Sequence, residues 1–227
     1  MRHTFERNME TIKNFVLLGE AGSGKSEIAL NLAAVLTQRR NQQVHFFDLD
    51  QTKPLFRARD VCAHPSQRQV RHHFQEQFYD APTQVGGLIP LLLDPEACVV
   101  MDVGGNEIGA RLVGGYAQCL NQENTAVWYV VNPYRPWNES VEQIDATMSS
   151  ILRAARIRRF HIVCNPNLGC ETTPQDVLRG LEDARRLIEP YMPIGLVCCA
   201  APLWDAVHSE CRLPLFSLQL HLDHPCE

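Results

Sequence analysis

Short apolar runs alternate along the whole chain with longer segments of mixed character. The runs that we expect to be strands are continuous and rich in β-branched residues, and they span 15–18, 43–48, 98–102, 125–131, 160–164 and 194–199. A continuous apolar run is typical of a strand that is covered on both faces. The alternation therefore predicts an α/β fold, with a doubly wound, mostly parallel sheet and helices on both of its faces.

The segments between these runs carry helix signals. Asn138 is a good N-cap for a segment whose apolar residues then recur at helical spacing. Thr173 and Asp176 have the spacing of a capping box at the start of a later helix. Residues 106–120 also predict a helix, although it contains glycines, each of which costs about 1 kcal/mol relative to alanine.

One interval, residues 51–97, is longer than the roughly twelve residues that a parallel crossover needs. Its central segment, 57–80, contains several arginines, histidines and aromatic residues. It is either a solvated helix with a loop or a surface that meets a partner or substrate, because long loops in compact domains are often functional. We expect a single P-loop NTPase domain over 1–227, with a switch or partner-binding insertion at 51–97.

The composition is that of a globular protein. Of the 227 residues, 45% are hydrophobic and 21% are charged, and the net charge of −5 argues against a nucleic-acid partner. The nine cysteines include no C-x-x-C pair, which favours reduced thiols in a core. No apolar run has the length of a membrane-spanning segment, and the first residues contain no apolar leader. We therefore expect a cytoplasmic protein without membrane insertion.

Residues 19–26 read G-E-A-G-S-G-K-S, a complete phosphate-binding motif between an apolar run and a helical segment at 27–38. Glycines in such a loop let backbone N–H groups surround a triphosphate. The lysine places a cation against the β- and γ-phosphates, and the final hydroxyl coordinates Mg²⁺. The predicted nucleotide-binding residues of this loop are Gly19, Gly22, Ser23, Gly24, Lys25 and Ser26, of which Lys25 is also catalytic and Ser26 is also a metal ligand.

Two acidic motifs follow apolar runs, at strand ends where parallel sheets form ligand sites. Asp48 and Asp50 alternate, so both lie on one side of an extended chain and can face one Mg²⁺ or an attacking water. Asp102 ends a later run and is followed by Gly105 in a D-x-x-G pattern. In that pattern the aspartate supports Mg²⁺ and the glycine N–H contacts the γ-phosphate, which is the basis of an order–disorder switch.

The expected base pocket lies at two later strand ends. Asn165 offers a donor and an acceptor, and Pro202 follows the run 194–199. The sequence has no N-K-x-D motif, with which many GTPases read guanine. ATP with Mg²⁺ is therefore the expected ligand.

With these motifs in place, the chain resembles the CobQ/CobB/MinD/ParA nucleotide-binding group of SIMIBI-class P-loop NTPases. The resemblance rests on the loop at 19–26, the acidic segment at 48–52, D-x-x-G at 102–105, the asparagine at 165 and the proline near 202. It implies slow ATP hydrolysis, coupled to conformational change and often to dimerisation. By this resemblance Asp50 positions the attacking water and Asp48 and Asp102 support the metal, so the expected catalytic residues are Lys25, Asp50 and Asp102.

The loop departs from MinD and ParA relatives at its second position. Those relatives carry a signature lysine there, which reaches the nucleotide of the other subunit, whereas this chain has Glu20. A carboxylate cannot supply that positive charge. A homodimer is therefore an expectation from the resemblance alone, without the residue that joins the two subunits.

Several functions remain open from the sequence. The first is a switch that hydrolyses Mg-ATP and thereby regulates or loads an unidentified protein partner. The second is a small-molecule kinase or ATP-dependent ligase of the dethiobiotin synthetase type, with its acceptor pocket in 51–97. The loop is also similar to that of metallochaperone GTPases, and a nucleotide-binding subunit with negligible hydrolysis is a further alternative.

Overall fold

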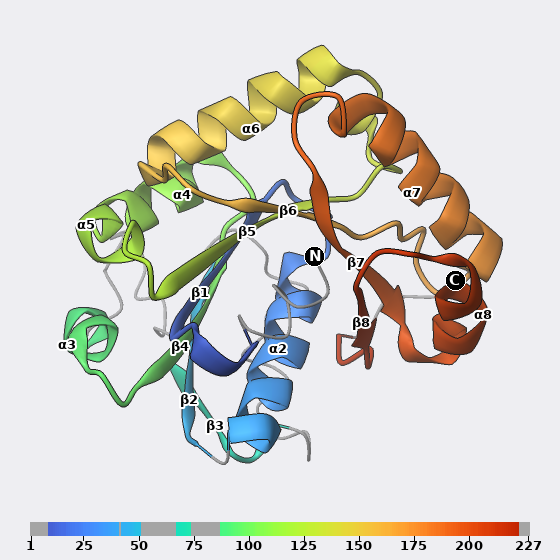
Figure 1. Ribbon diagram of the computed structural model, residues 1–227. Coiled ribbons are helices and arrows are strands. Elements are labelled where there is room, and N and C mark those ends of the chain that lie inside the picture. The colour runs from blue at the N-terminus through green and yellow to red at the C-terminus, as the bar shows by residue number, and fades with distance from the viewer. Residues whose placement is uncertain (1–8, 41, 51–66, 74–86, 223–227) are drawn as a thin grey trace.

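A computed structural model of the chain describes residues 9–40, 42–50, 67–73 and 87–222. These residues form an eight-stranded sheet in the order β3-β2-β4-β1-β5-β6-β7-β8, with every neighbouring pair parallel (Figure 1). The strands are β1 (Asn14–Gly19), β2 (Val44–Leu49), β3 (Val70–His73), β4 (Cys98–Val103), β5 (Thr125–Val131), β6 (His161–Cys164), β7 (Ile194–Ala200) and β8 (Leu215–Leu218). The predicted parallel α/β fold is confirmed.

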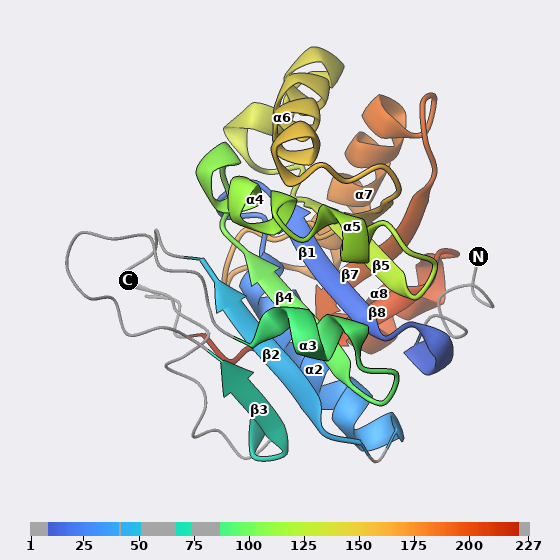
Figure 2. The same cartoon turned by 90° about the vertical axis from the view of Figure 1, so that its left-hand side faces the viewer.

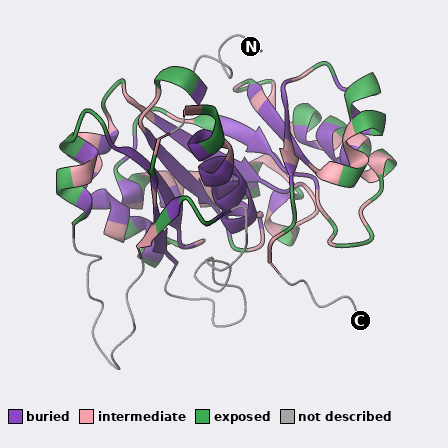
Figure 3. Cartoon of the chain, turned by 90° about the horizontal axis from the view of Figure 1, so that it is seen from below, coloured by how far each residue is buried: buried purple, intermediate pink, exposed green. Residues whose placement is uncertain are grey.

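Helices cover both faces of the sheet. They are α2 (Lys25–Arg40), α3 (Leu88–Leu93), α4 (Glu107–Gly114), α5 (Ala117–Leu120), α6 (Val141–Ala155), α7 (Pro174–Ile188) and α8 (Trp204–Glu210), with 3₁₀ turns η3 (Pro136–Asn138) and η4 (Ala201–Leu203). One apolar cluster joins the sheet to α2, and the other joins the opposite face to α3 through α8. Figure 3 shows the buried strands between helices whose outer surfaces are exposed.

The continuous apolar runs follow from this sandwich. In β1, Phe15 and Leu17 belong to the cluster on the α2 side, and Val16 and Leu18 belong to the cluster on the opposite side. Because successive side chains of a strand point to opposite faces, a strand that is covered twice needs apolar residues at every position. The runs in the sequence therefore predicted six of the strands with small differences at their ends.

Two edge strands were missed. β3 pairs with β2 at one edge and β8 pairs with β7 at the other. β3 reads Val-Arg-His-His and lies in the interval 51–97, which was predicted as a helix and loop or as a partner surface. Of the segment 57–80, the parts 57–66 and 74–80 lie outside the described residues. The expectation of a switch or partner-binding insertion stays a prediction.

Helix ends required two corrections. Ser140, not Asn138, is the N-cap of α6, and its side chain accepts from the N–H of Gln143. Asn138 lies in η3, where its amide donates to the carbonyl of Asn132. The helix predicted over 106–120 is two helices, because the chain turns between α4 and α5. The capping box at the start of α7 is confirmed.

Cysteines mostly fill the core as small side chains. Cys98, Cys164, Cys198 and Cys199 are buried thiols, and burial raises the pKa of Cys98 to about 11. The prediction of reduced thiols is wrong at Cys170, which is disulfide-bonded.

Candidate nucleotide site

The loops after the strands meet at one edge of the sheet. All strands run in the same direction, so their carboxyl ends share that edge, and the chain order reverses around the central strand β1 (Figure 2). Open parallel sheets bind ligands at such a reversal. The loop Gly19–Ser26, called the phosphate loop below, follows β1 at this point and continues into α2.

At two positions the backbone of the phosphate loop leaves no room for a side chain. Gly19 has φ 134°, and a Cβ there would lie 2.3 Å from the carbonyl oxygen of Val130. Gly24 has φ 92°, and its Cβ would lie 2.2 Å from the amide nitrogen of Asn165. Both positions therefore require glycine, for conformational freedom and for space. The motif's glycines are explained by this close approach.

Carbonyl groups of the phosphate loop accept from four side chains, one of which is the hydroxyl of Ser23, at 2.8 Å from the carbonyl of Glu20. The ammonium of Lys25 donates to the carbonyl of Glu20 at 2.8 Å, the Nε of Arg135 donates to that of Gly22 at 3.0 Å, and the amide of Asn165 donates to that of Ser23 at 2.9 Å. The first turn of α2 leaves its backbone N–H groups without acceptors from the helix itself. A loop built in this way, at a helix N-terminus, suits an anion.

Two buried aspartates lie side by side below the loop. Asp48 and Asp102 are register partners on β2 and β4. Asp102 is 1% exposed, and its Oδ1 has no hydrogen-bond partner among the described residues. Burial and the neighbouring Asp48 raise the pKa of Asp102 to about 7, although Lys25 and the Ser26 hydroxyl oppose the shift. Within the described part of the chain, one oxygen of the Asp102 carboxyl group is therefore left for a ligand.

These residues fit a hard divalent cation such as Mg²⁺. The Ser26 hydroxyl, Asp48 and the orphaned oxygen of Asp102 are oxygen ligands, which Mg²⁺ prefers. The described residues contain no cluster of three or more His, Cys, Asp or Glu side chains arranged for a metal ion. Mg²⁺ in phosphate-transfer sites needs only one or two carboxylates, because water and phosphate oxygens complete its shell.

Asp50 and the D-x-x-G segment also meet. A Cβ on Gly104 would lie 3.4 Å from Oδ1 of Asp50, which is 5% exposed. The N–H of Ala21 in the phosphate loop donates to the carbonyl of Gly105 at 3.1 Å. The segment after β4 is thus attached directly to the phosphate loop, with Asp50 beside it.

This attachment predicts a large effect of Gly105→Ala. A Cβ at Gly105 would lie 2.5 Å from the backbone nitrogen of Ala21, so one of the two backbones must move. We expect nucleotide affinity to fall by about tenfold or more and the free energy of unfolding to fall by about 1–3 kcal/mol. Isothermal titration calorimetry and urea unfolding measure the two effects.

Gly115→Ala is the matched control for that substitution. Gly115 has helical φ and ψ of −66° and −23°, and the nearest atom to its Cβ would be 3.6 Å away. We expect the control to bind nucleotide like the wild type. Equal affinities for Gly105→Ala and Gly115→Ala would contradict a role of this contact.

A cavity of about 400 Å³ adjoins the phosphate loop on the side of β6 and β7. Asn165 and Pro202, both predicted to contact the base, line it together. Asn165 is 2% exposed and also holds Ser23 through its amide. The C-terminal segment 218–220 forms another part of the wall.

Two side chains of α2 hold that segment in place. Asn31 makes a reciprocal pair with the backbone of Gln219, accepting at 2.8 Å and donating at 2.9 Å. The carboxylate of Glu27 accepts from the N–H groups of His221 and Leu222. The cavity wall is thus fixed to the helix that follows the phosphate loop.

Glu20 turns into the protein. It is 8% exposed, and neither carboxyl oxygen has a hydrogen-bond partner among the described residues. Burial raises the pKa of Glu20, while the nearby Thr147 hydroxyl and Lys25 oppose the shift. Its carboxyl group therefore does not extend from the loop toward solvent.

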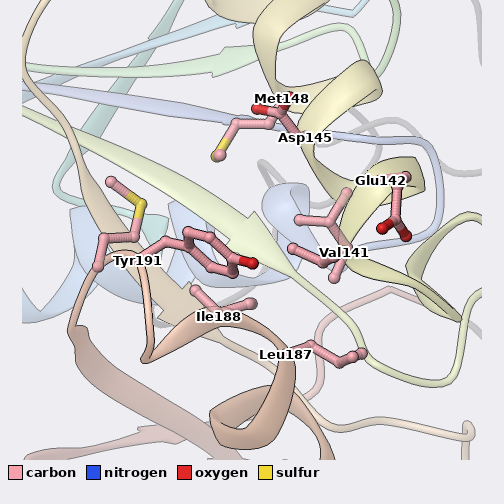
Figure 4. Close-up of a pocket in the computed structure, with 9 residues that line it drawn as sticks. Val141, Glu142, Asp145, Met148, Leu187, Ile188 and Tyr191 are labelled. Atoms are coloured by element: carbon pink, nitrogen blue, oxygen red, sulfur yellow. The ribbon is translucent and has the colours of Figure 1, made fainter.

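A second cavity, of about 420 Å³, lies between α6 and α7 (Figure 4). Its walls are mostly apolar, with Met148 and Tyr191 facing it and with Glu142 and Asp145 as its charged residues. None of the predicted site residues lines it. It is separate from the candidate nucleotide site.

Sequence reasoning missed Arg135, Glu27 and Asn31. Arg135 follows the apolar run 125–131, just as Asp50 follows the run 43–48, so the same rule about strand ends would have found it. Arg111 of α4 is exposed and pairs with Glu107.

No protein-family model matches the chain, and no curated protein matches it. Among solved structures, it is similar to a nucleotide-binding protein in complex with ADP from Archaeoglobus fulgidus, with 18% identity, 82% of each chain covered and a TM-score of 0.43. It is also similar to the signal recognition particle 54 kDa protein of Aeropyrum pernix in complex with GDP, with 16% identity and a TM-score of 0.37. FtsY of Mycoplasma mycoides shows 11% identity and a TM-score of 0.37.

These similarities are weak, and they do not bear on what the chain binds. The alignment covers 94% of this chain but 43% of the Aeropyrum protein, and 90% of this chain but 59% of FtsY. The chain thus spans less than two thirds of those two proteins. Within the described part of the chain, every helix is too short or too polar to cross a bilayer.

Proposed function

We propose that this chain is a P-loop NTPase of the SIMIBI class that binds and hydrolyses Mg-ATP and acts as a switch for a protein partner. The observation that carries the proposal is the contact between three motifs. The phosphate loop, the buried Asp48 and Asp102 pair, and the Gly104–Gly105 segment all lie at one edge of the sheet. Their convergence supports triphosphate chemistry more strongly than the loop motif does alone.

Each residue then has a task in hydrolysis. The loop N–H groups and Lys25 bind the β- and γ-phosphates. Ser26, Asp48 and Asp102 would hold Mg²⁺, which when bound neutralises phosphate charge. Asp50 positions the water that attacks the γ-phosphorus, because it lies next to Gly104 in the segment that is attached to the phosphate loop. These groups act by positioning the reactants and by electrostatic stabilisation, which are the main sources of catalysis in phosphoryl transfer.

The contact between Gly105 and Ala21 supports the switch. A γ-phosphate bound in the loop competes for the N–H groups that surround it, so loss of that phosphate changes the contacts available to the segment after β4. α4 follows this segment directly, so its position can depend on the nucleotide. A protein partner or a second copy of the chain in a homodimer would respond to this change.

We propose ATP rather than GTP, in a cytoplasmic protein. The cavity beside the loop has a buried Asn165 for base recognition and lacks the aspartate of an N-K-x-D motif. The amide of Asn165 already donates to Ser23, which leaves its oxygen to accept from an exocyclic amino group. Adenine offers such a donor at the position where guanine has a carbonyl.

Binding and single-turnover hydrolysis of ATP and GTP test this function. We expect Mg-ATP to bind more tightly than Mg-GTP, and ADP release to stop when Mg²⁺ is chelated. A preference for GTP would favour the metallochaperone-like GTPase. Turnover that requires a small acceptor would favour the kinase or ligase, and binding of neither nucleotide would refute the proposal.

A further inference from the structure

Arg135 lies directly against the middle of the phosphate loop. It comes from the loop after β5, is half-buried, and donates through Nε to the carbonyl of Gly22 at 3.0 Å. A Cβ at Gly22 would lie 3.1 Å from Nε and 3.4 Å from the central guanidinium carbon. The guanidinium is therefore packed on the loop itself.

Among the residues that the structure describes, no carboxylate neutralises the charge of Arg135. No carboxylate of the described residues lies within ion-pair distance, whereas Arg111, Arg185 and Arg186 pair with acidic side chains on their own helices. The Nε–H of Arg135 donates to the carbonyl of Gly22, and a guanidinium has about four further N–H donors. A half-buried cation of this kind is favourable where an anion meets it. The anion site within reach is the phosphate loop.

The loop that carries Arg135 is firmly held. The side chain of Asn132 accepts from the N–H of Tyr134 and donates to the carbonyl of Asn167 at 2.8 Å. Asn138 donates to the carbonyl of Asn132, also at 2.8 Å. The hydroxyl of Tyr134 donates to a backbone carbonyl of α7 at 2.6 Å. Charged groups that are fixed before the reaction stabilise developing charge best.

We propose that Arg135 is a catalytic residue whose guanidinium contacts the phosphates of the bound nucleotide. This inference rests on the proposed function. In hydrolysis the water oxygen bonds to the γ-phosphorus, the bond from that phosphorus to the β–γ bridging oxygen breaks, and the proton of water passes to the phosphate product. Negative charge grows on the bridging oxygen, where a guanidinium stabilises it.

Arg135 also offsets the change at the second position of the loop. Glu20 brings no positive charge there and turns inward. Arg135 supplies a second cation from the same chain, in addition to Lys25. Catalysis by this arrangement needs no residue from another subunit.

Three substitutions at Arg135 separate charge from packing. Arg135→Ala removes both, Arg135→Gln keeps a donor for the Gly22 carbonyl, and Arg135→Lys keeps the charge. We expect Arg135→Ala and Arg135→Gln to lower Mg-ATP affinity by about tenfold and kcat by about 10- to 100-fold. Arg135→Lys is expected to restore most of the ATP affinity. Arg186→Ala, an exposed arginine on α7, is the control with the same loss of charge and should behave like the wild type.

Affinity for AMP distinguishes a phosphate contact from a folding defect. A direct contact with the β- and γ-phosphates predicts a loss that grows from AMP to ADP to ATP. Equal losses for AMP and ATP, or wild-type kcat in Arg135→Gln, would overturn the inference and leave the proposed function standing. Wild-type protein that binds neither ATP nor GTP would overturn both.

A second measurement uses the unmodified sequence. Phenylglyoxal reacts with accessible arginines, and mass spectrometry of the peptide that contains Arg135 reports its extent. We expect Mg-ATP and Mg-tripolyphosphate to protect Arg135 while Arg186 continues to react. Unchanged modification of Arg135 in the presence of either ligand, at saturating concentration, would contradict the contact.

Discussion

Lys25→Ala is expected to lower ATP hydrolysis by about 100- to 1000-fold and ATP affinity by about tenfold or more. Lys25 is 2% exposed, and its ammonium donates to the carbonyl of Glu20 inside the phosphate loop. It is also a cation that opposes the upward pKa shifts of Glu20 and Asp102. Its removal therefore deprives both the phosphates and the buried carboxyl groups of positive charge. Calorimetry with ATP and single-turnover kinetics measure the loss.

Two further variants sharpen that experiment. Lys13→Ala removes a half-buried lysine that donates to the carbonyl of Asp94, at the opposite end of β1. It changes the net charge equally and should leave ATP hydrolysis unchanged. Lys25→Arg should not restore activity, because the planar guanidinium needs more room than the ammonium has in this loop. Wild-type ATP affinity in Lys25→Ala would refute the assignment of the nucleotide site.

Asp102→Asn is expected to abolish Mg²⁺-dependent hydrolysis and, at the same time, to stabilise the protein without ligand. Asp102 is 1% exposed beside Asp48, and these surroundings raise its pKa to about 7. An amide has no charge to desolvate, so the substitution removes a cost of folding above neutral pH. We expect a gain of about 2 kcal/mol at pH 8, which corresponds to a rise in Tm of about 5 °C.

The sign of the pH dependence follows from the raised pKa. The folded protein holds the Asp102 proton up to about pH 7, whereas the unfolded chain releases it near the ordinary aspartate pKa of 3.8. The contribution of Asp102 to stability is therefore full below pH 3.8 and is lost as the pH rises through 7. Urea unfolding between pH 4 and 8 should show this loss in the wild type and a flatter difference in Asp102→Asn.

Asp145→Asn is the matched control for that substitution. Asp145 is an exposed carboxylate on α6 that accepts from the hydroxyl of Ser149. We expect it to change neither the hydrolysis rate nor the pH dependence of stability. A stabilised Asp102→Asn variant that still hydrolyses ATP at the wild-type rate would show that Asp102 does not support the metal.

Much of the site could be predicted from short sequence motifs, because its residues lie at or after the carboxyl ends of strands, which share one edge of the sheet. Glycines at positions 19 and 24 are required by the loop's own backbone, and Asp48 and Asp102 end strands that any parallel arrangement brings to one edge. Their side-by-side register was not predictable from either motif. Register is set by pairing between strands, which local sequence does not encode.

The N-cap at Ser140 shows where local rules give several answers. The sequence predicted Asn138 as the cap, although Ser140 is a residue type that caps helices equally well. In the structure Asn138 belongs to η3 and its amide donates to the carbonyl of Asn132, while Ser140 caps α6. Cap preference by itself therefore did not decide the helix start.

The sequence by itself determined the parallel α/β fold and the phosphate loop. Strands that are buried on both faces need continuous apolar runs, and a loop that surrounds phosphate needs glycines at fixed positions. Both features can therefore be recognised in short stretches of the sequence. Only the tertiary structure decided that Arg135 meets Gly22, across 113 positions, and that Asn31 meets Gln219, across 188. Such contacts depend on how distant segments pack together, and no local pattern specifies them.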